Sequence, residues 1–259
     1  MRVFLLTDME GIAGIHDFEQ MDREKDTFRN SCALLERTIN LAIAACCDNG
    51  AQQVYYLDGH HGGNNVIPEN MDGRAIACTI ADWQALLREG KIDCQIEIGA
   101  HARAGTLGGF LDHTLSSNFF CIKYNGLEMS ELSLHAILCA SYGVPIVAVT
   151  GDEEACRQAR SYIPDIFTGA VKKASCRNQA ETYPNADRIL VETIEKALAN
   201  YKKVSLIRYA EPAHIQATFC RTDFCEKVLA KRGAEVRRVD ARTLEKTAAQ
   251  IRTYGDLKI

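Results

Sequence analysis

Short apolar runs and longer stretches with helical periodicity follow one another along the first half of the chain. The apolar runs predict buried strands at 3–7, 54–57, 96–98, 119–124 and 145–150. Apolar residues at helical spacing predict helices at 31–48, 82–89 and 128–138. Because a strand, a helix and a further strand are joined by short links, we expect right-handed parallel units. The pattern therefore predicts an α/β fold with a mostly parallel sheet flanked by helices in three layers.

The pattern is looser after about residue 165. It predicts strands at 168–173, 204–207 and 236–239, and helices at 186–200, 222–231 and 244–254. The turn at 160–164 is the best candidate for a domain boundary. We therefore expect a larger α/β domain at 1–163 and a smaller C-terminal α+β portion at 164–259, although the second part could equally continue the first.

Composition and charge argue against several classes of protein. Lys and Arg number 30 against 34 Asp and Glu, giving a net charge of -4, whereas nucleic acids and anionic membranes require a basic patch. No apolar stretch approaches the ~20 residues that span a bilayer, and no signal peptide is recognised. The 11 scattered cysteines include no Cys-x-x-Cys pair, which is typical of small core side chains in a reducing compartment. We therefore expect no nucleic-acid partner, no membrane contact and no disulfide.

Carboxylates and histidines stand just after three of the predicted strands. The residues concerned are Asp8, Glu10, His60 and His101. Ligands of open α/β sheets bind at the carboxyl ends of the strands, so we expect these side chains to face one site. Asp8 and Glu10 point the same way, because side chains one residue apart lie on the same face of a strand. The alternative is that Asp8 caps a helix whose first turn contains Glu10.

A fifth candidate lies on the helix predicted at 128–138. Glu131 and His135 are four residues apart and share one face of an apolar helix. Burying such groups costs free energy unless they are paired or bound to a metal. We therefore add Glu131 to the candidate metal ligands, with solvent exposure on a polar edge as the alternative.

This set exceeds the three protein ligands that one catalytic zinc usually takes. It suits two divalent metal ions bridged by a carboxylate. Mixed nitrogen and oxygen donors favour zinc, with manganese or cobalt as alternatives. Two such ions hold a hydroxide between them and stabilise the oxygen that gains charge during attack. The predicted reaction is hydrolysis of an amide or an ester, at a metal site in the domain 1–163.

His113 is the candidate catalytic side chain. It follows a glycine-rich loop and has no evident role in the core. We expect it to donate a hydrogen bond to the tetrahedral oxyanion or to transfer a proton. The alternative is an exposed loop histidine. The sequence identifies no substrate-binding residue.

The motifs that carry these residues resemble those of the zinc-dependent D-aminopeptidases of the DppA type. The family signature Asp-x-Glu-Gly-x-x-Gly is matched at 8–14 (DMEGIAG). Four further segments resemble its motifs in the same order, namely 58–60 (DGH), 99–104 (GAHARA), 112–115 (DHTL) and 130–136 (SELSLHA). Segments 150–152 (TGD) and 170–172 (AVK) also resemble the family. The resemblance runs over nearly the whole chain and is strongest through about residue 180.

The resemblance implies a role for each candidate residue. Two zinc ions would be bound by Asp8, Glu10, His60, His101 and Glu131. His113 would stand at the position proposed for the catalytic side chain. Members of the family are cytoplasmic, assemble into large ring-like homo-oligomers with enclosed active sites, and release N-terminal D-residues from short peptides such as D-Ala-D-Ala. We therefore expect a dinuclear metallo-aminopeptidase of the cytoplasm.

Several residues depart from the family pattern near the candidate site. Leu6 and Gly59 replace serines, His135 replaces an asparagine, and Ser130 and Ser133 replace glycines. Because neighbours of metal ligands orient them and tune the metal, these changes leave the substrate open. One alternative is a related metallohydrolase, such as an amidase acting on a small amide. A second is a metal-dependent binding protein without turnover, against which the presence of His113 argues.

Overall fold

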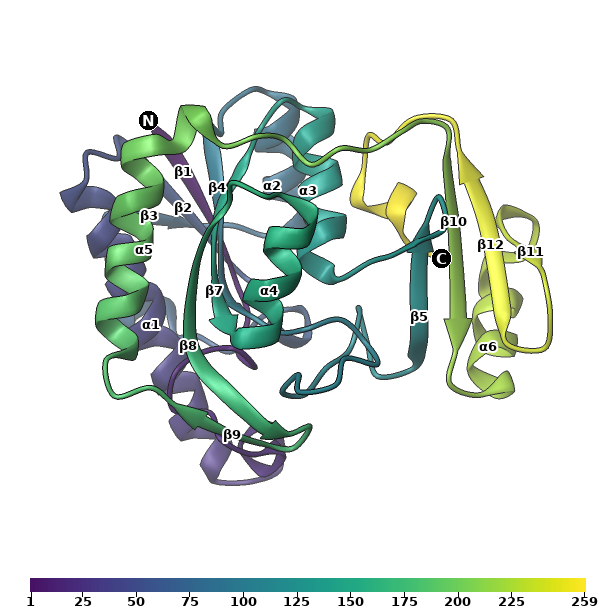
Figure 1. Cartoon of the computed structure of the whole chain (residues 1–259), viewed down its shortest axis with the longest axis horizontal. Coiled ribbons are helices and arrows are strands. Elements are labelled where there is room, and N and C mark those ends of the chain that lie inside the picture. The colour runs from purple at the N-terminus through teal and green to yellow at the C-terminus, as the bar shows by residue number, and fades with distance from the viewer.

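The strands form two sheets, and the computed structural model describes all 259 residues (Figure 1). The larger sheet contains β1 (Arg2–Thr7), β2 (Gln53–Asp58), β3 (Ala75–Ala77), β4 (Cys94–Ala100), β7 (Ile146–Asp152), β8 (Phe167–Cys176) and β9 (Gln179–Thr182). Its strands lie in the order β3-β2-β1-β4-β7-β8-β9, and all neighbours are parallel except β8 and β9. The predicted mostly parallel sheet is confirmed.

Helices cover both faces of this sheet (Figure 1). One face carries α1 (Thr27–Asp48) and α5 (Ala186–Asn200), and the other carries α2 (Ile80–Arg88), α3 (Glu131–Ser141) and α4 (Glu153–Tyr162). The stripe on α1 that includes Leu35, Ile39 and Ile43 is buried, as its helical spacing requires. α3 is buried over most of its length, because it packs against β4, α4 and the C-terminal turn. The predicted three layers are confirmed.

The second sheet is antiparallel and stands beside the helices of the larger one (Figure 1). It contains β5 (Phe119–Tyr124), β6 (Leu127–Glu128), β10 (Ala213–Phe219), β11 (Arg237–Arg238) and β12 (Thr243–Ala248), and it is accompanied by α6 (Thr222–Arg232). The strand order is β11-β12-β10-β5-β6. The two sheets do not divide the chain at 163, because β8 and β9 join the first sheet while β5 and β6 join the second. A separately folding portion that begins at residue 164 stays a prediction.

Predictions for three segments after residue 200 were wrong or too long. The segment 204–207 is irregular, and its apolar pattern reflects the burial of Val204 and Ile207 against the core. The strand expected at 236–239 is reduced to the two residues of β11. The segment 244–254 begins as strand β12, because Leu244 pairs with Ala217 across the sheet. Its apolar residues match a helical spacing, but pairing with β10 overrides that local preference.

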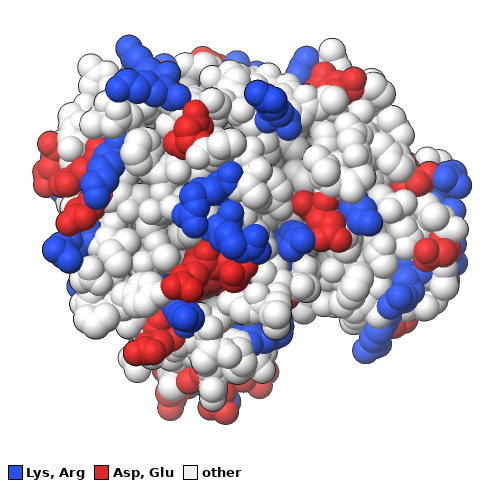
Figure 2. Space-filling model, in the orientation of Figure 1, with Lys and Arg blue, Asp and Glu red and all other residues white.

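Short 3-10 turns connect several of these elements. They are η1 (Phe18–Met21), η2 (His60–Gly62), η3 (Pro68–Asn70), η4 (Tyr201–Lys203), η5 (Gly233–Glu235) and η6 (Tyr254–Leu257). On the face of the molecule shown in Figure 2, basic and acidic side chains are interspersed. All 11 cysteines are free thiols. None of the helices is both long enough and apolar enough to cross a bilayer.

Candidate metal centre

Three adjacent strands deliver candidate ligands to one edge of the larger sheet. Thr7, the last residue of β1, pairs with Asp58 on β2 and with Ile98 on β4. The residues that follow these strand ends therefore meet, as the sequence predicts. They include Asp8, Glu10, His60 and His101, all of them buried or half-buried.

Glycines allow the segments after β1 and β4 to touch. The amide of Gly11 donates to the carbonyl of Gly99 at 2.8 Å. Gly99 has a φ of +75°, and a Cβ atom there would lie 2.1 Å from the carbonyl oxygen of Asp8. A Cβ atom on Gly11 would lie 2.2 Å from the carbonyl oxygen of Ala100. Only glycine fits both positions, because any side chain would push these two segments apart.

Asp8, Glu10 and His60 form a first group of three potential metal donors. Nδ1 of His60 lies 3.1 Å from Oδ1 of Asp8 and 3.0 Å from Oε2 of Glu10. Two hydrogen bonds from Asn65 fix the loop that carries His60. The side chain of Asn65 donates to the carbonyl of His60 at 2.6 Å, and its backbone amide donates to Asp58 at 2.7 Å.

His101, His113 and Glu131 form a second group of three donors. Nε2 of His101 lies 3.4 Å from Oε1 of Glu131, and Nε2 of His113 lies 3.6 Å from the same oxygen. Glu131 is the first residue of α3, where Ser130 caps the helix by accepting a hydrogen bond from the amide of Ser133. The cap fixes the point at which the helix begins and hence the position of Glu131.

Asp8 joins the two groups. Its Oδ1 faces His60 in the first group, and its Oδ2 lies 3.5 Å from Nε2 of His101 in the second. A carboxylate with one oxygen toward each group has the geometry of a ligand that bridges two cations. The structure thus brings together all six residues singled out from the sequence. The sequence left open which carboxylate would bridge, and Asp8 is the one that lies between the two sets of donors.

Backbone carbonyls orient two of the imidazoles. Nδ1 of His101 hydrogen bonds to the carbonyl of Ala102 at 3.0 Å, and Nδ1 of His113 bonds to the carbonyl of Leu111 at 2.8 Å. A carbonyl only accepts, so each Nδ1 carries a proton and Nε2 is left for another partner. Both Nε2 atoms face Glu131, and a hydrogen bond from Nδ1 to a carbonyl is the usual way in which a metal-binding histidine is oriented.

The donor set fits a divalent cation. Nε2 of His101, the atom that faces Asp8 and Glu131, is buried without a hydrogen-bond partner. Such orphaned atoms are rare in folded proteins and call for an explanation, for which an ion is one candidate. Carboxylate oxygens combined with imidazole nitrogens form the donor set that zinc takes in hydrolases.

Electrostatics within the cluster favour positive charge. Burial by itself would raise the pKa of Asp8, but the neighbouring imidazoles of His101 and His60 outweigh it and hold that pKa well below its usual range. Burial likewise opposes ionisation of Glu131, yet His101 lowers the pKa of Glu131 to about 2. Burial alone would lower the pKa of His60, but Glu10 and Asp8 raise it to about 10. The carboxylates thus stay ionised and attract cations, whether imidazolium or metal.

Lys172 supports the site and was missed as a functional residue. It is fully buried, and its ammonium donates to the carbonyls of Glu10 at 2.8 Å and Ile15 at 2.6 Å. Burial lowers the pKa of Lys172 to about 7. The family resemblance of 170–172 is the one signal at this lysine in the sequence, and it assigns no role, because the acceptors lie more than 150 residues away in the chain.

The backbone around His113 is strained. Leu111 and Leu115 have φ values of +48° and +65°, a region that residues other than glycine seldom adopt. Each has a function in this conformation. Leu111 offers its carbonyl to His113, and the amide of Leu115 donates to Glu131 at 2.8 Å. Such strain, of order 1–3 kcal/mol per residue, is typically found at functional sites.

The departures near the site are accommodated in different ways. His135 is buried, with Nδ1 3.3 Å from Glu97 and Nε2 2.9 Å from the hydroxyl of Tyr254. Gly59 is closely confined, since a Cβ atom there would lie 2.9 Å from the carbonyl of Thr7. Leu6 is buried and forms part of the wall of the cavity described next.

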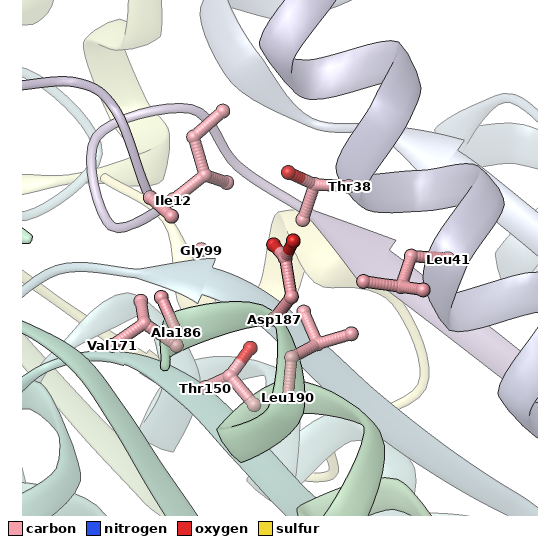
Figure 3. A pocket seen from close by; sticks show the side chains of 10 residues that line it. Ile12, Thr38, Leu41, Gly99, Thr150, Val171, Ala186, Asp187 and Leu190 are labelled. Atoms are coloured by element: carbon pink, nitrogen blue, oxygen red, sulfur yellow. The ribbon is translucent and has the colours of Figure 1, made fainter. Parts of the chain in front are cut away.

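A cavity of about 1080 Å³ opens onto the candidate ligands. Its walls include Asp8, Glu10, His60, His113 and Glu131, whereas His101 lies beneath them. A second hollow lies among residues of α1 and α5, where Figure 3 shows Asp187 pointing between Thr38 and Leu41. Its volume of about 10 Å³ is sufficient for a single water molecule. Only the larger cavity can accept a peptide.

Comparisons with known proteins identify the family of this chain. A family model described as D-aminopeptidase matches residues 1–256. A D-aminopeptidase of Bacillus subtilis (strain 168) is 29% identical over 209 residues, which cover 79% of this chain and 76% of the relative. A solved structure, described as the Zn-dependent D-aminopeptidase DppA from Bacillus subtilis, a self-compartmentalizing protease, matches with a TM-score of 0.89 and 23% identity, covering 98% of this chain and 94% of that chain. The structural match confirms the fold, and because the family model spans nearly the whole chain, this protein belongs to the D-aminopeptidase family and is a peptidase.

Proposed function

We propose that this D-aminopeptidase is a dinuclear zinc enzyme that removes N-terminal D-residues from short peptides such as D-Ala-D-Ala. The observation that carries the proposal is the position of Asp8 between two groups of donors. Asp8, Glu10 and His60 would hold one ion, and His101 and Glu131 the other, with Asp8 bridging. The donor chemistry supports zinc, and the solved relative from Bacillus subtilis is described as Zn-dependent.

When bound, two zinc ions would supply Lewis acidity that activates a shared water as hydroxide and polarises the scissile carbonyl. The remaining steps fall to side chains of this chain. Carboxylates at the cavity wall offer ion-pair partners to the substrate's N-terminal ammonium. The position of Nε2 of His113 in the cavity wall supports a role as donor to the carbonyl oxygen that gains negative charge during attack.

His113 suits this role better than the role of a third metal ligand. Its side chain is 20% exposed, whereas that of His101 is 2% exposed. The carbonyl of Leu111 holds its Nδ1–H, so the ring gains and loses its second proton at Nε2, on the side of the cavity. A group that can take up a proton there can also deliver it to the departing amine.

We further propose that the protein acts in the cytoplasm as a ring-like homo-oligomer that encloses its active sites. Free thiols at all 11 cysteines suit a reducing compartment. The solved relative, whose fold matches over nearly the full length, is described as self-compartmentalizing. Sedimentation velocity would test the assembly, and a monomer at micromolar concentration would contradict it.

An amidase acting on small amides is the second candidate function. It is favoured by the changes near the site, above all by His135, which fixes Tyr254 in the cavity wall. A binding protein without turnover is disfavoured by the position of His113 beside Glu131.

A stereochemical assay separates these functions. The zinc-loaded protein is incubated with D-Ala-D-Ala, with L-Ala-L-Ala and with D-alanine amide, and released alanine is measured. We expect D-Ala-D-Ala to be cleaved at least tenfold faster than the L-dipeptide, and His60→Ala to abolish this activity. His214→Ala is the matched control, because His214 pairs with Glu245 on the second sheet. Cleavage of the amide alone would assign the amidase function, and no cleavage would favour the binding protein.

A further inference from the structure

The C-terminal turn forms part of the wall of the catalytic cavity. Tyr254 and Lys258 line the cavity together with His113 and Glu131, although more than 100 residues separate the two pairs in the chain. Nothing in the proposed chemistry at the metal centre uses either residue. We therefore ask what Tyr254 and Lys258 contribute to the cavity.

Several contacts hold this turn in place. The hydroxyl of Tyr254 bonds to Nε2 of His135 at 2.9 Å, and the amide of Tyr254 donates to the side chain of Gln84 on α2 at 2.8 Å. Leu257 is fully buried, and the hydroxyl of Tyr142 donates to the carbonyl of Arg252 at 2.7 Å. The wall is thus built into the fold, so the residue that follows it has a defined position.

Lys258 is the one cation of the cavity wall that forms neither an ion pair nor a side-chain hydrogen bond. Arg177 pairs with Asp112 at 3.1 Å, and Arg23 donates to Asn65 at 3.1 Å. The ammonium of Lys258 lies 3.8 Å from the centroid of the Tyr254 ring. Lys258 and Glu131 line the same cavity.

We propose that Lys258 binds the C-terminal carboxylate of a short peptide substrate. The proposal rests on the aminopeptidase function proposed above. Lys258 lines the same cavity as His113 and Glu131. Its ammonium lies over the ring of Tyr254, which His135 holds one turn of α3 beyond Glu131. In a dipeptide the C-terminal carboxylate lies only one residue, about 3.5 Å, beyond the scissile carbonyl. A short peptide bound at the metal centre therefore has its C-terminal carboxylate in the cavity that Lys258 lines.

A cation at this point compensates for the desolvation of the substrate carboxylate. A carboxylate that enters a half-buried cavity loses part of its hydration. A charge-assisted hydrogen bond from an ammonium offsets that cost. The same contact cannot form with a peptide whose carboxyl group is blocked, so Lys258 would make the enzyme selective for short peptides with a free C-terminus.

The test compares D-Ala-D-Ala with D-Ala-D-Ala amide, which differ only in the charge of the C-terminus. We expect wild-type zinc enzyme to prefer the free acid in kcat/KM, and Lys258→Gln to lower that acid-to-amide ratio by about 10-fold to 100-fold. Lys258→Arg should retain most of the preference. Lys202→Gln is the matched control, because Lys202 also stands over a tyrosine ring, at 5.8 Å, but outside the cavity.

Each outcome decides between the two proposals. An acid-to-amide ratio in Lys258→Gln equal to that of the wild type would overturn the role of Lys258 and leave the aminopeptidase function standing. Equal hydrolysis of both peptides by the wild type would also overturn the role of Lys258 and leave the aminopeptidase function standing. If the wild type cleaved neither peptide, the proposed function would fail, and the proposal for Lys258 would fall with it.

Discussion

The imidazole rings of His101 and His113 lie parallel, with their centroids 3.9 Å apart and an interplanar angle of 8°. Both rings present Nε2 to the same oxygen of Glu131, yet only His113 reaches the wall of the cavity. In this stacked pair, His113 therefore has access to substrate and His101 does not. The first prediction follows from this difference in access.

Replacing the two histidines one at a time should separate metal binding from catalysis. His113→Ala should keep the zinc content of the wild type but lower kcat by about 100-fold to 10,000-fold, the usual contribution of a general acid or base. His101→Ala should lose zinc and activity together. Zinc content by mass spectrometry and steady-state kinetics check both variants. Loss of zinc in His113→Ala would make that residue a ligand, and a change in KM alone would make it a substrate contact.

Lys172→Met should weaken zinc binding about 10-fold to 100-fold, as the loss of a group that orients a metal ligand typically does. The variant keeps the volume of the side chain but removes the donors that hold the carbonyls of Glu10 and Ile15. Competition with a zinc chelator measures the affinity. Lys173→Met is the control, because the adjacent lysine is exposed on the other face of β8. Equal affinities in the two variants would refute the supporting role of Lys172.

Gly99→Ala should destabilise the protein by about 3 kcal/mol or more, from overpacking added to backbone strain. Its Cβ would lie 2.1 Å from the carbonyl of Asp8, so zinc should be lost as well. Gly90→Ala is the matched control, because Gly90 also has a positive φ, +61°, but open space around it. Urea unfolding of both variants checks the comparison. An equal loss of unfolding free energy in Gly99→Ala and Gly90→Ala would mean that the close approach of the segments after β1 and β4 is unimportant for stability.

Removing the metal should lower the thermal stability of the protein. Three carboxylates, Asp8, Glu10 and Glu131, share one cluster, and cations that bind only the folded state stabilise it by mass action. Calorimetry before and after chelation should show a fall in Tm that added zinc reverses. An unchanged Tm in protein verified to contain zinc beforehand would argue that the ions contribute nothing to folding.

The sequence predicts the larger sheet and the candidate ligands well, because both depend on local patterns. Apolar runs mark the strands, and residues just after neighbouring strand ends must meet, so Asp8, His60 and His101 could be brought together without a structure. The second sheet was harder. No strand was predicted at β10, although the alternation in 213–219, with Ala213, Ile215 and Phe219 buried, could have marked it. The signal of β12 competed with a helical spacing.

Other parts of the cavity depend on contacts that no local pattern reveals. Lys172 meets Glu10 from a distant strand, and Lys258 reaches the cavity because Tyr254 packs on His135. Lys172 stands in a segment that resembles the family, but its role is not evident there, and Lys258 has no distinguishing pattern around it. Their roles arise from tertiary packing, which a single sequence does not specify by spacing alone.

The zinc content of each chain tests the central claim most directly. The protein is stripped with a chelator, reloaded with zinc, desalted and measured by mass spectrometry together with Asp8→Asn. We predict two zinc ions per chain in the wild type and fewer than two in Asp8→Asn, because Asp8 lies between both groups of donors. A single zinc ion per wild-type chain, or two ions in Asp8→Asn, would contradict a dinuclear centre bridged by Asp8.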